Sequence, residues 1–134
     1  MKNNKGFSLV ELIVVIAIMA ILAAVAIPTF ATFITKAQDA SGVQEVADLV
    51  YAAKLACAEF NSEVESAVVA DDGTTVTITF EGDEADDAAE QAAAVVENAQ
   101  VSGANNKVVI LTFSKALSDK GIADAEDTLG DWVE

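Results

Sequence analysis

The sequence is poor in the residues that most often carry out chemistry. It has no histidine and a single cysteine, Cys57, among its 134 residues. A chain without histidine lacks the commonest general base and metal ligand. A single cysteine excludes an intramolecular disulfide and a cysteine metal cluster. We therefore expect no catalytic residue, no metal site and no cofactor, and we expect that the protein is not an enzyme.

Positive charge is also scarce. Seven lysines and no arginine stand against 22 acidic residues, which gives a formal net charge of −15. Nucleic-acid binding depends on lysine and arginine side chains that neutralise phosphates. No two of the five lysines beyond residue 6 are adjacent. We therefore expect no direct contact with nucleic acid.

A long apolar segment near the N-terminus is what the sequence does have. It runs for 21 residues from Phe7 to Ile27, with Glu11 as its one charged residue. A helix of roughly 20 apolar residues is enough to span a bilayer. Lys2 and Lys5 precede the segment, and by the positive-inside rule they hold the N-terminus in the cytoplasm. The segment predicts a single-pass membrane helix, and the domain that follows it should lie outside the cytoplasm.

Glu11 is out of place in that segment. A carboxylate deep in hydrocarbon is unfavourable by about 2.5 to 3.5 kcal/mol on insertion scales. Such a residue is seldom kept without a function. We therefore expect Glu11 to have a partner.

The helical pattern continues beyond Pro28. Apolar residues recur every three or four positions as far as residue 60, while charged residues such as Asp39 fall mostly off this stripe. We expect Pro28 to kink the helix and not to end it. The stripe consists of Phe30, Phe33, Ala37, Ala40, Val43, Val46, Val50, Ala53, Cys57 and Phe60.

The remaining residues predict a small sheet. Two runs rich in β-branched residues, 66–70 and 74–80, are joined by Asp71-Asp72-Gly73, which is typical of a hairpin turn. Residues 102–106 predict a loop. The apolar run Lys107–Phe113 then predicts a central strand.

A helix is predicted between the hairpin and the last strand. Asp83 is its expected N-cap, and one face carries Ala85, Ala89, Ala92, Val96 and Ala99. Residues 114–134 give no clear pattern. The predicted fold class is α+β: a long N-terminal helix, membrane-spanning in its first half, packed on a small antiparallel sheet with one further helix.

Several residue types at the N-terminus occur at fixed offsets. Lys5, Gly6, Phe7 and Ser8 are followed by Glu11, then by sixteen apolar residues and Pro28. This segment resembles the prepilin signal of the type IV pilin and pseudopilin family. The resemblance divides the chain into a leader at 1–6, a transmembrane and filament-core helix at 7–28, and a globular domain at 29–134, of which 29–60 is the second half of the long helix.

The resemblance implies how the chain is processed and assembled. A prepilin peptidase would cut between Gly6 and Phe7, and the new amine of Phe7 would be methylated. Glu11 would then meet the N-terminal amine of a neighbouring subunit, so Phe7, Glu11 and Pro28 are the expected assembly residues. The implied partners are other copies in a filament and an inner-membrane assembly platform. The chain would lie in the cytoplasmic membrane before assembly and in a surface filament or pseudopilus afterwards.

Two alternatives remain open. The same signal fits a pseudopilin of a type II secretion or DNA-uptake system. An ordinary signal peptide would instead give a secreted acidic binding domain, with Lys2 and Lys5 before an apolar core at 12–23 and a cleavage site at 24–26. The acid at the head of that core and the helical pattern beyond Pro28 argue against the signal peptide.

Overall fold

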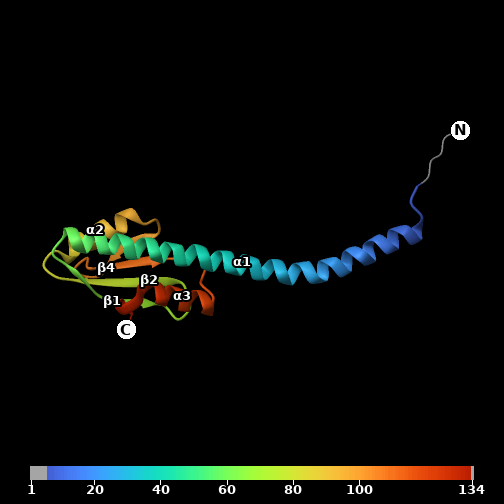
Figure 1. Ribbon diagram of the computed structural model, residues 1–134. Coiled ribbons are helices and arrows are strands. Elements are labelled where there is room, and N and C mark those ends of the chain that lie inside the picture. The colour runs from blue at the N-terminus through green and yellow to red at the C-terminus, as the bar shows by residue number, and fades with distance from the viewer. Residues whose placement is uncertain (1–5, 134) are drawn as a thin grey trace. The chain divides into compact units, whose positions relative to one another are not determined.

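The computed structural model describes residues 6–133, and the chain divides into two compact units. The first unit ends at Thr35 and the second begins at Lys36, and each is described by itself. The helices and strands are α1 (Leu9–Glu59), β1 (Glu63–Val69), β2 (Thr75–Glu81), α2 (Ala85–Val95), β3 (Ala99–Ser102), β4 (Val108–Thr112) and α3 (Asp119–Leu129), followed by a short 3-10 turn (Gly130–Trp132) (Figure 1).

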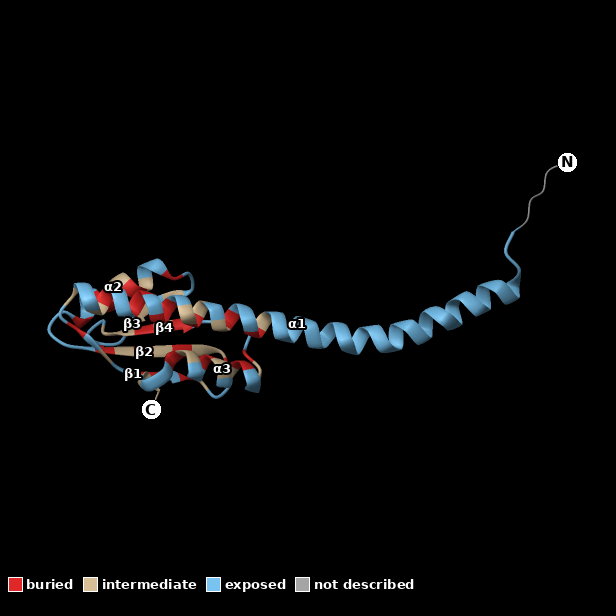
Figure 2. Ribbon diagram, viewed as in Figure 1, coloured by how far each residue is buried: buried red, intermediate tan, exposed pale blue. Residues whose placement is uncertain are grey.

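The first unit is formed by the first part of α1. Every described residue from Gly6 to Thr35 is exposed, as the uniform colour of this part of the helix shows in Figure 2. The helix continues through Pro28, so this proline does not end it. Three threonine hydroxyls donate to carbonyls one turn earlier in the helix: Thr29 to Val25 at 3.0 Å, Thr32 to Pro28 at 3.1 Å and Thr35 to Ala31 at 3.1 Å.

The second unit is built on a four-stranded sheet in the order β1-β2-β4-β3, with every pair antiparallel. The predicted antiparallel sheet is confirmed, and so is the interior position of the strand predicted at 107–113. Side chains alternate along β2, where Val76, Ile78 and Phe80 are buried. Val76 pairs with Leu111 and Ile78 with Val109, so one face of the sheet carries the core.

The core lies between this sheet face and helices α1 and α2, and Ala125 and Leu129 of α3 also belong to it. The second part of α1 buries Val46, Leu49 and Ala53 completely. α2 packs over β2, β3 and β4, and its buried residues are alanines. Small side chains let a helix approach a sheet closely, so bulky residues of the sheet such as Phe80 fill the space between them.

The hairpin between β1 and β2 depends on Gly73. This residue has a φ of 72°, a conformation that side chains rarely adopt. Its carbonyl accepts from the N–H of Leu117 at 2.8 Å. A Cβ atom at residue 73 would overlap the backbone of Leu117. The turn and the chain segment before α3 are thus packed directly against each other.

The prediction for α2 was wrong at both ends. The N-cap is Glu84 and not Asp83, and no side chain caps the helix. The Glu84 carboxylate instead accepts from the backbone N–H of Asn61 at 2.8 Å. At the other end, Asn98 has a φ of 67° and Ala99 begins β3, so Ala99 does not belong to the helical face.

Two further differences concern the C-terminal part. The loop predicted at 102–106 begins one residue later, because Ser102 is still paired with Val108 in the sheet. Residues 114–134 contain a second further helix, α3, which lies along β1. Its N-cap is Ser118, whose side chain accepts from the N–H of Gly121 at 3.3 Å. The predicted fold class is confirmed, with one helix more than expected.

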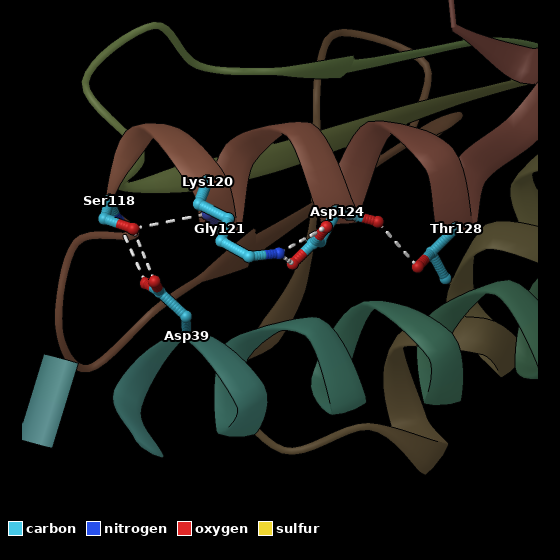
Figure 3. A network of polar contacts seen from close by, with 6 residues as sticks. All are labelled: Asp39, Ser118, Lys120, Gly121, Asp124 and Thr128. Atoms are coloured by element: carbon cyan, nitrogen blue, oxygen red, sulfur yellow. Dashed lines mark hydrogen bonds and ion pairs between the residues drawn. The ribbon is translucent and has the colours of Figure 1, made fainter. Parts of the chain in front are cut away.

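Asp39 attaches α3 to α1 (Figure 3). Its side chain is buried, with 9% of the residue exposed, although the sequence pattern placed it off the apolar stripe. It accepts from the backbone N–H of Ser118 at 2.9 Å and from the hydroxyl of the same residue. A Cβ atom on Gly121 would lie 2.6 Å from Asp39 Oδ1, so glycine leaves the room that this carboxylate occupies.

We expect Asp39→Ala to destabilise the second unit. The substitution leaves the N–H and hydroxyl of Ser118 without their acceptor, which lowers the free energy of unfolding by about 1–3 kcal/mol. Urea denaturation of residues 29–134, followed by circular dichroism, measures this change. The exposed Glu90→Ala is the matched control and should stay within about 0.5 kcal/mol of the unsubstituted fragment. Equal stability of the Asp39 and Glu90 variants would show that the contact with α3 contributes nothing.

Candidate processing and assembly site

The expected cleavage site lies just before the first helix. Gly6, Phe7 and Ser8 are not helical, and α1 begins at Leu9. A side chain at residue 6 would meet no atom within 4 Å, and Phe7 is 80% exposed. The peptide bond between Gly6 and Phe7 is therefore accessible to a protease, and no helix has to unwind first. Lys2 and Lys5, on which the leader prediction also depends, lie outside the described residues.

Glu11 has a partner within its own chain. Its Oε2 atom accepts from the backbone N–H of Ser8 at 3.2 Å, and its own N–H donates to the hydroxyl of Ser8 at 3.2 Å. This reciprocal pair is a capping box, in which the N-cap residue and the third helical residue satisfy each other's free N–H groups. A negative charge in the first turn is also favoured by the helix dipole.

The capping box was missed by the sequence reasoning, although its signal was present. Ser8-Leu9-Val10-Glu11 follows the pattern of serine, two residues and glutamate before an apolar run. The partner predicted for Glu11 was the N-terminal amine of a neighbouring subunit. The structure adds a nearer partner, Ser8. Among the described residues, no group donates a hydrogen bond to Glu11 Oε1.

Pro28 is not part of the same local site. It lies 17 residues after Glu11 in one continuous helix, which separates the two by about 26 Å at 1.5 Å per residue. Gly6, Phe7 and Glu11 lie within one turn of the helix start, whereas Pro28 lies far along it. Any common function of these four residues would have to be in the packing of the whole helix.

The surroundings of this site are apolar. Residues 12–35 contain no charged side chain. Among residues 6–133, α1 is the helix whose length and composition would allow it to cross a membrane, with a mean hydropathy of 3.0 in its most apolar window and none of that window buried. A helix that is apolar on all sides requires lipid or protein around it.

The comparisons with known proteins agree with this N-terminal site. Residues 1–27 match the family described as the prokaryotic N-terminal methylation motif. The chain thus carries the prepilin signal of type IV pilins and pseudopilins, and its long apolar helix fits a membrane-anchored protein of this kind. No curated protein and no solved structure matches the chain.

Loss of the capping box should fray the start of α1. Ser8→Ala removes the N-cap acceptor, a change worth about 1 kcal/mol, so the Glu11 amide should exchange its hydrogen about fivefold faster. Hydrogen exchange measured by NMR in detergent micelles tests this. Ser8→Thr should retain protection, because threonine also caps. Unchanged exchange in Ser8→Ala would mean that the two hydrogen bonds do not hold the helix end.

Proposed function

We propose that this protein is the structural subunit of a type IV pilus-like filament. A prepilin peptidase cuts between Gly6 and Phe7, and the new amine of Phe7 is methylated. The precursor crosses the cytoplasmic membrane once, with its N-terminus in the cytoplasm, and an inner-membrane assembly platform adds it to the filament. The observation that carries this proposal is the prepilin-type signal followed by a helix with no buried residue in the first unit.

The apolar surface of the first unit supports polymerisation. Large side chains such as Leu9, Ile21 and Phe30 are between 66% and 74% exposed there. Lipid would cover this surface in the precursor. Outside the membrane only other proteins could do so, and further copies of the same helix have matching length and polarity. A filament core made of residues 7–28 meets this requirement, with Pro28 at its outer limit.

Glu11 is suited to bind a neighbour's amine because it is already oriented. The capping box holds its Oε2 atom at the helix start, and a carboxylate can accept further hydrogen bonds on its second oxygen. Removal of one partner from a buried charge pair is strongly unfavourable, whereas a complete pair recovers much of the desolvation penalty. Glu11 would thus favour a subunit whose amine lies beside it in the filament.

The division of the chain follows the proposed function. We propose that residues 1–6 are removed, that 7–28 form the core helix and that 29–134 form the globular part exposed on the filament. The compact second unit starts at Lys36. The seven residues 29–35 therefore precede the compact unit in the sequence, and residues 29–60 form the second half of α1.

A second candidate uses the same signal. Pseudopilins of type II secretion or DNA-uptake systems carry it as well, and the acidic composition does not favour direct contact with DNA. The third candidate, a secreted domain released by signal peptidase, is less well supported. Its expected cleavage site at residues 24–26 lies in the middle of a continuous helix.

The mature protein should begin at Phe7 with a methylated amine. Mass spectrometry of the N-terminal peptide from the native host measures this directly. The expected peptide begins FSLVE and is heavier by one methyl group. A mature chain that begins at Ile27 would instead show an ordinary signal peptide, and it would end the filament proposal.

Substitutions of Glu11 separate its charge from its capping bond. Glu11→Gln keeps a capping residue but loses the charge, and Glu11→Ala loses both. We expect normal cleavage in both, because Glu11 lies beyond the cut bond, and at least about tenfold fewer filaments, because a buried charge pair is lost. Immunoblots of sheared filaments and of membrane fractions measure both properties.

Ser8→Ala is the matched control for these two variants. It loses the hydrogen bond from the Glu11 N–H to the Ser8 hydroxyl but keeps the charge, so filaments should persist. Wild-type filament abundance in Glu11→Gln would show that the charge is not needed, and the proposed amine pairing would then be wrong.

A further inference from the structure

The face of α1 that points away from the core in the second unit is uncharged. We call this face the outer strip and define it by six residues: Ala40, Gln44, Ala47, Tyr51, Leu55 and Ala58. Tyr51 is 66% exposed and Leu55 is 50% exposed, which is unusual for large apolar side chains on a globular unit. Val95 at the end of α2 adds a third large exposed side chain, and it lines a hollow beside Tyr51.

The spacing of the outer strip is that of a helix-packing surface. Its members follow one another at steps of four, three, four, four and three residues. Steps of this kind keep a seam of side chains on one side of a helix, as in coiled coils. α1 thus carries two seams. Val46, Leu49 and Ala53 lie on the inner seam and are buried, whereas among residues 6–133 the outer strip is exposed except for the half-buried Ala47.

The two edges of the outer strip carry opposite charges. At 3.6 residues per turn, Lys36 and Lys54 lie along one edge, and Asp48 and Glu59 lie along the other. Lys54 lies 5.9 Å from the ring centroid of Trp132.

Neighbouring elements place further charged side chains beside both edges of the strip. On the lysine side, α3 contributes Lys120, Asp124 and Asp127 along a hollow of about 610 Å³ beside Ala40. Lys120 and Asp124 are already paired with each other at 3.1 Å. This pair is neutral, so α3 adds to the lysine edge only the one negative charge of Asp127.

The acidic edge is crowded with like charges. Glu45 and Glu97 lie beside Asp48 around the hollow next to Tyr51. Burial raises the pKa of Glu45, and the negative charges of Glu97 and Asp48 raise it further. Among residues 6–133 the only ion pair is that between Lys120 and Asp124, so none of the described lysines neutralises the edge. A cation supplied from outside the chain would relieve this repulsion.

We propose that the outer strip docks α1 of further copies of this chain, packed parallel, with the lysine edge of one copy against the acidic edge of the next. This proposal rests on the proposed filament. The strip adds to the proposed filament a second contact, which lies in the globular unit apart from residues 7–28 and sets how neighbouring subunits are oriented.

The edge charges favour parallel packing in particular. When two identical helices pack in parallel, each brings opposite edges of its seam together, whereas antiparallel packing brings like edges together. Here parallel packing pairs lysine with acid. Copies anchored through the same N-terminal helix all point the same way, which agrees with this direction. Two copies packed in register would form a closed pair, whereas copies displaced along the helix axis leave part of the strip free, so the contact can then repeat along an open filament.

Edge reversal in the full chain tests this arrangement. K36E/K54E makes both edges acidic, and D48K/E59K makes both basic. Each should reduce sheared filaments at least about tenfold, while the cleaved subunit remains in the membrane at normal amounts. The fourfold variant K36E/K54E/D48K/E59K restores opposite edges and should recover filaments. K107E and E65K, which change charge away from the strip, should have no effect.

Crosslinking of filaments gives a second measurement that does not depend on reversed charges. In a Cys57→Ala background, Ala40→Cys should be joined between copies by a long-arm bismaleimide, and Glu65→Cys on β1 should not. Normal filaments in both edge-reversed variants, no recovery in the fourfold variant, or crosslinks at residue 65 and not at residue 40 would overturn the strip proposal and leave the filament intact. Absence of any filament from the wild-type chain would overturn both.

Discussion

The need of α1 to cover its apolar surface is the constraint on which the rest of the structure depends. As far as Thr35 the helix is exposed on every side and has no contact that hides it. From Val46 onward one side is covered by the sheet, through Leu49, Ala53 and the side chains of β2 and β4. The free energy available from apolar burial, about 25 cal/mol per Å², is thus only partly realised in a single chain. Lipid around the precursor, or the polymer proposed above, would realise the remainder.

The globular unit shows how a chain with a single cysteine can be held together without an intramolecular disulfide. Its core combines alanine-faced helices with bulky residues of the sheet. Polar contacts are few and well placed. Asp39 attaches the start of α3 to α1, and Gly73 allows the β1–β2 turn to pack against the chain just before that helix. These two contacts bring the C-terminal segment to the same end of the sheet as the start of the unit.

The sequence predicted the elements with strong periodicity and missed those defined by single residues. The hairpin and the strand β4 have clear apolar patterns, and both were found. The α1 stripe was right from Val43 onward, whereas its first four members, Phe30, Phe33, Ala37 and Ala40, are exposed. α3 has glycine and acids within a weak pattern, and its start is set by Ser118 and by the distant Asp39. Local sequence cannot show a contact across 79 residues. At the candidate site, the junction at Gly6 and Phe7 was readable, and so was the capping box of Ser8 and Glu11, which was overlooked.

The threonines of the first unit have a consequence for movement between environments. The hydroxyls of Thr29, Thr32 and Thr35 each donate a hydrogen bond to a backbone carbonyl of the same helix. None of these hydroxyls needs water, a lipid headgroup or a side chain from another subunit. This stretch can therefore leave hydrocarbon and enter a protein interior without exchanging a single hydrogen bond. To the helix, a lipid tail and a neighbour's leucine are equivalent surroundings, so extraction from the membrane requires no change in its internal bonding.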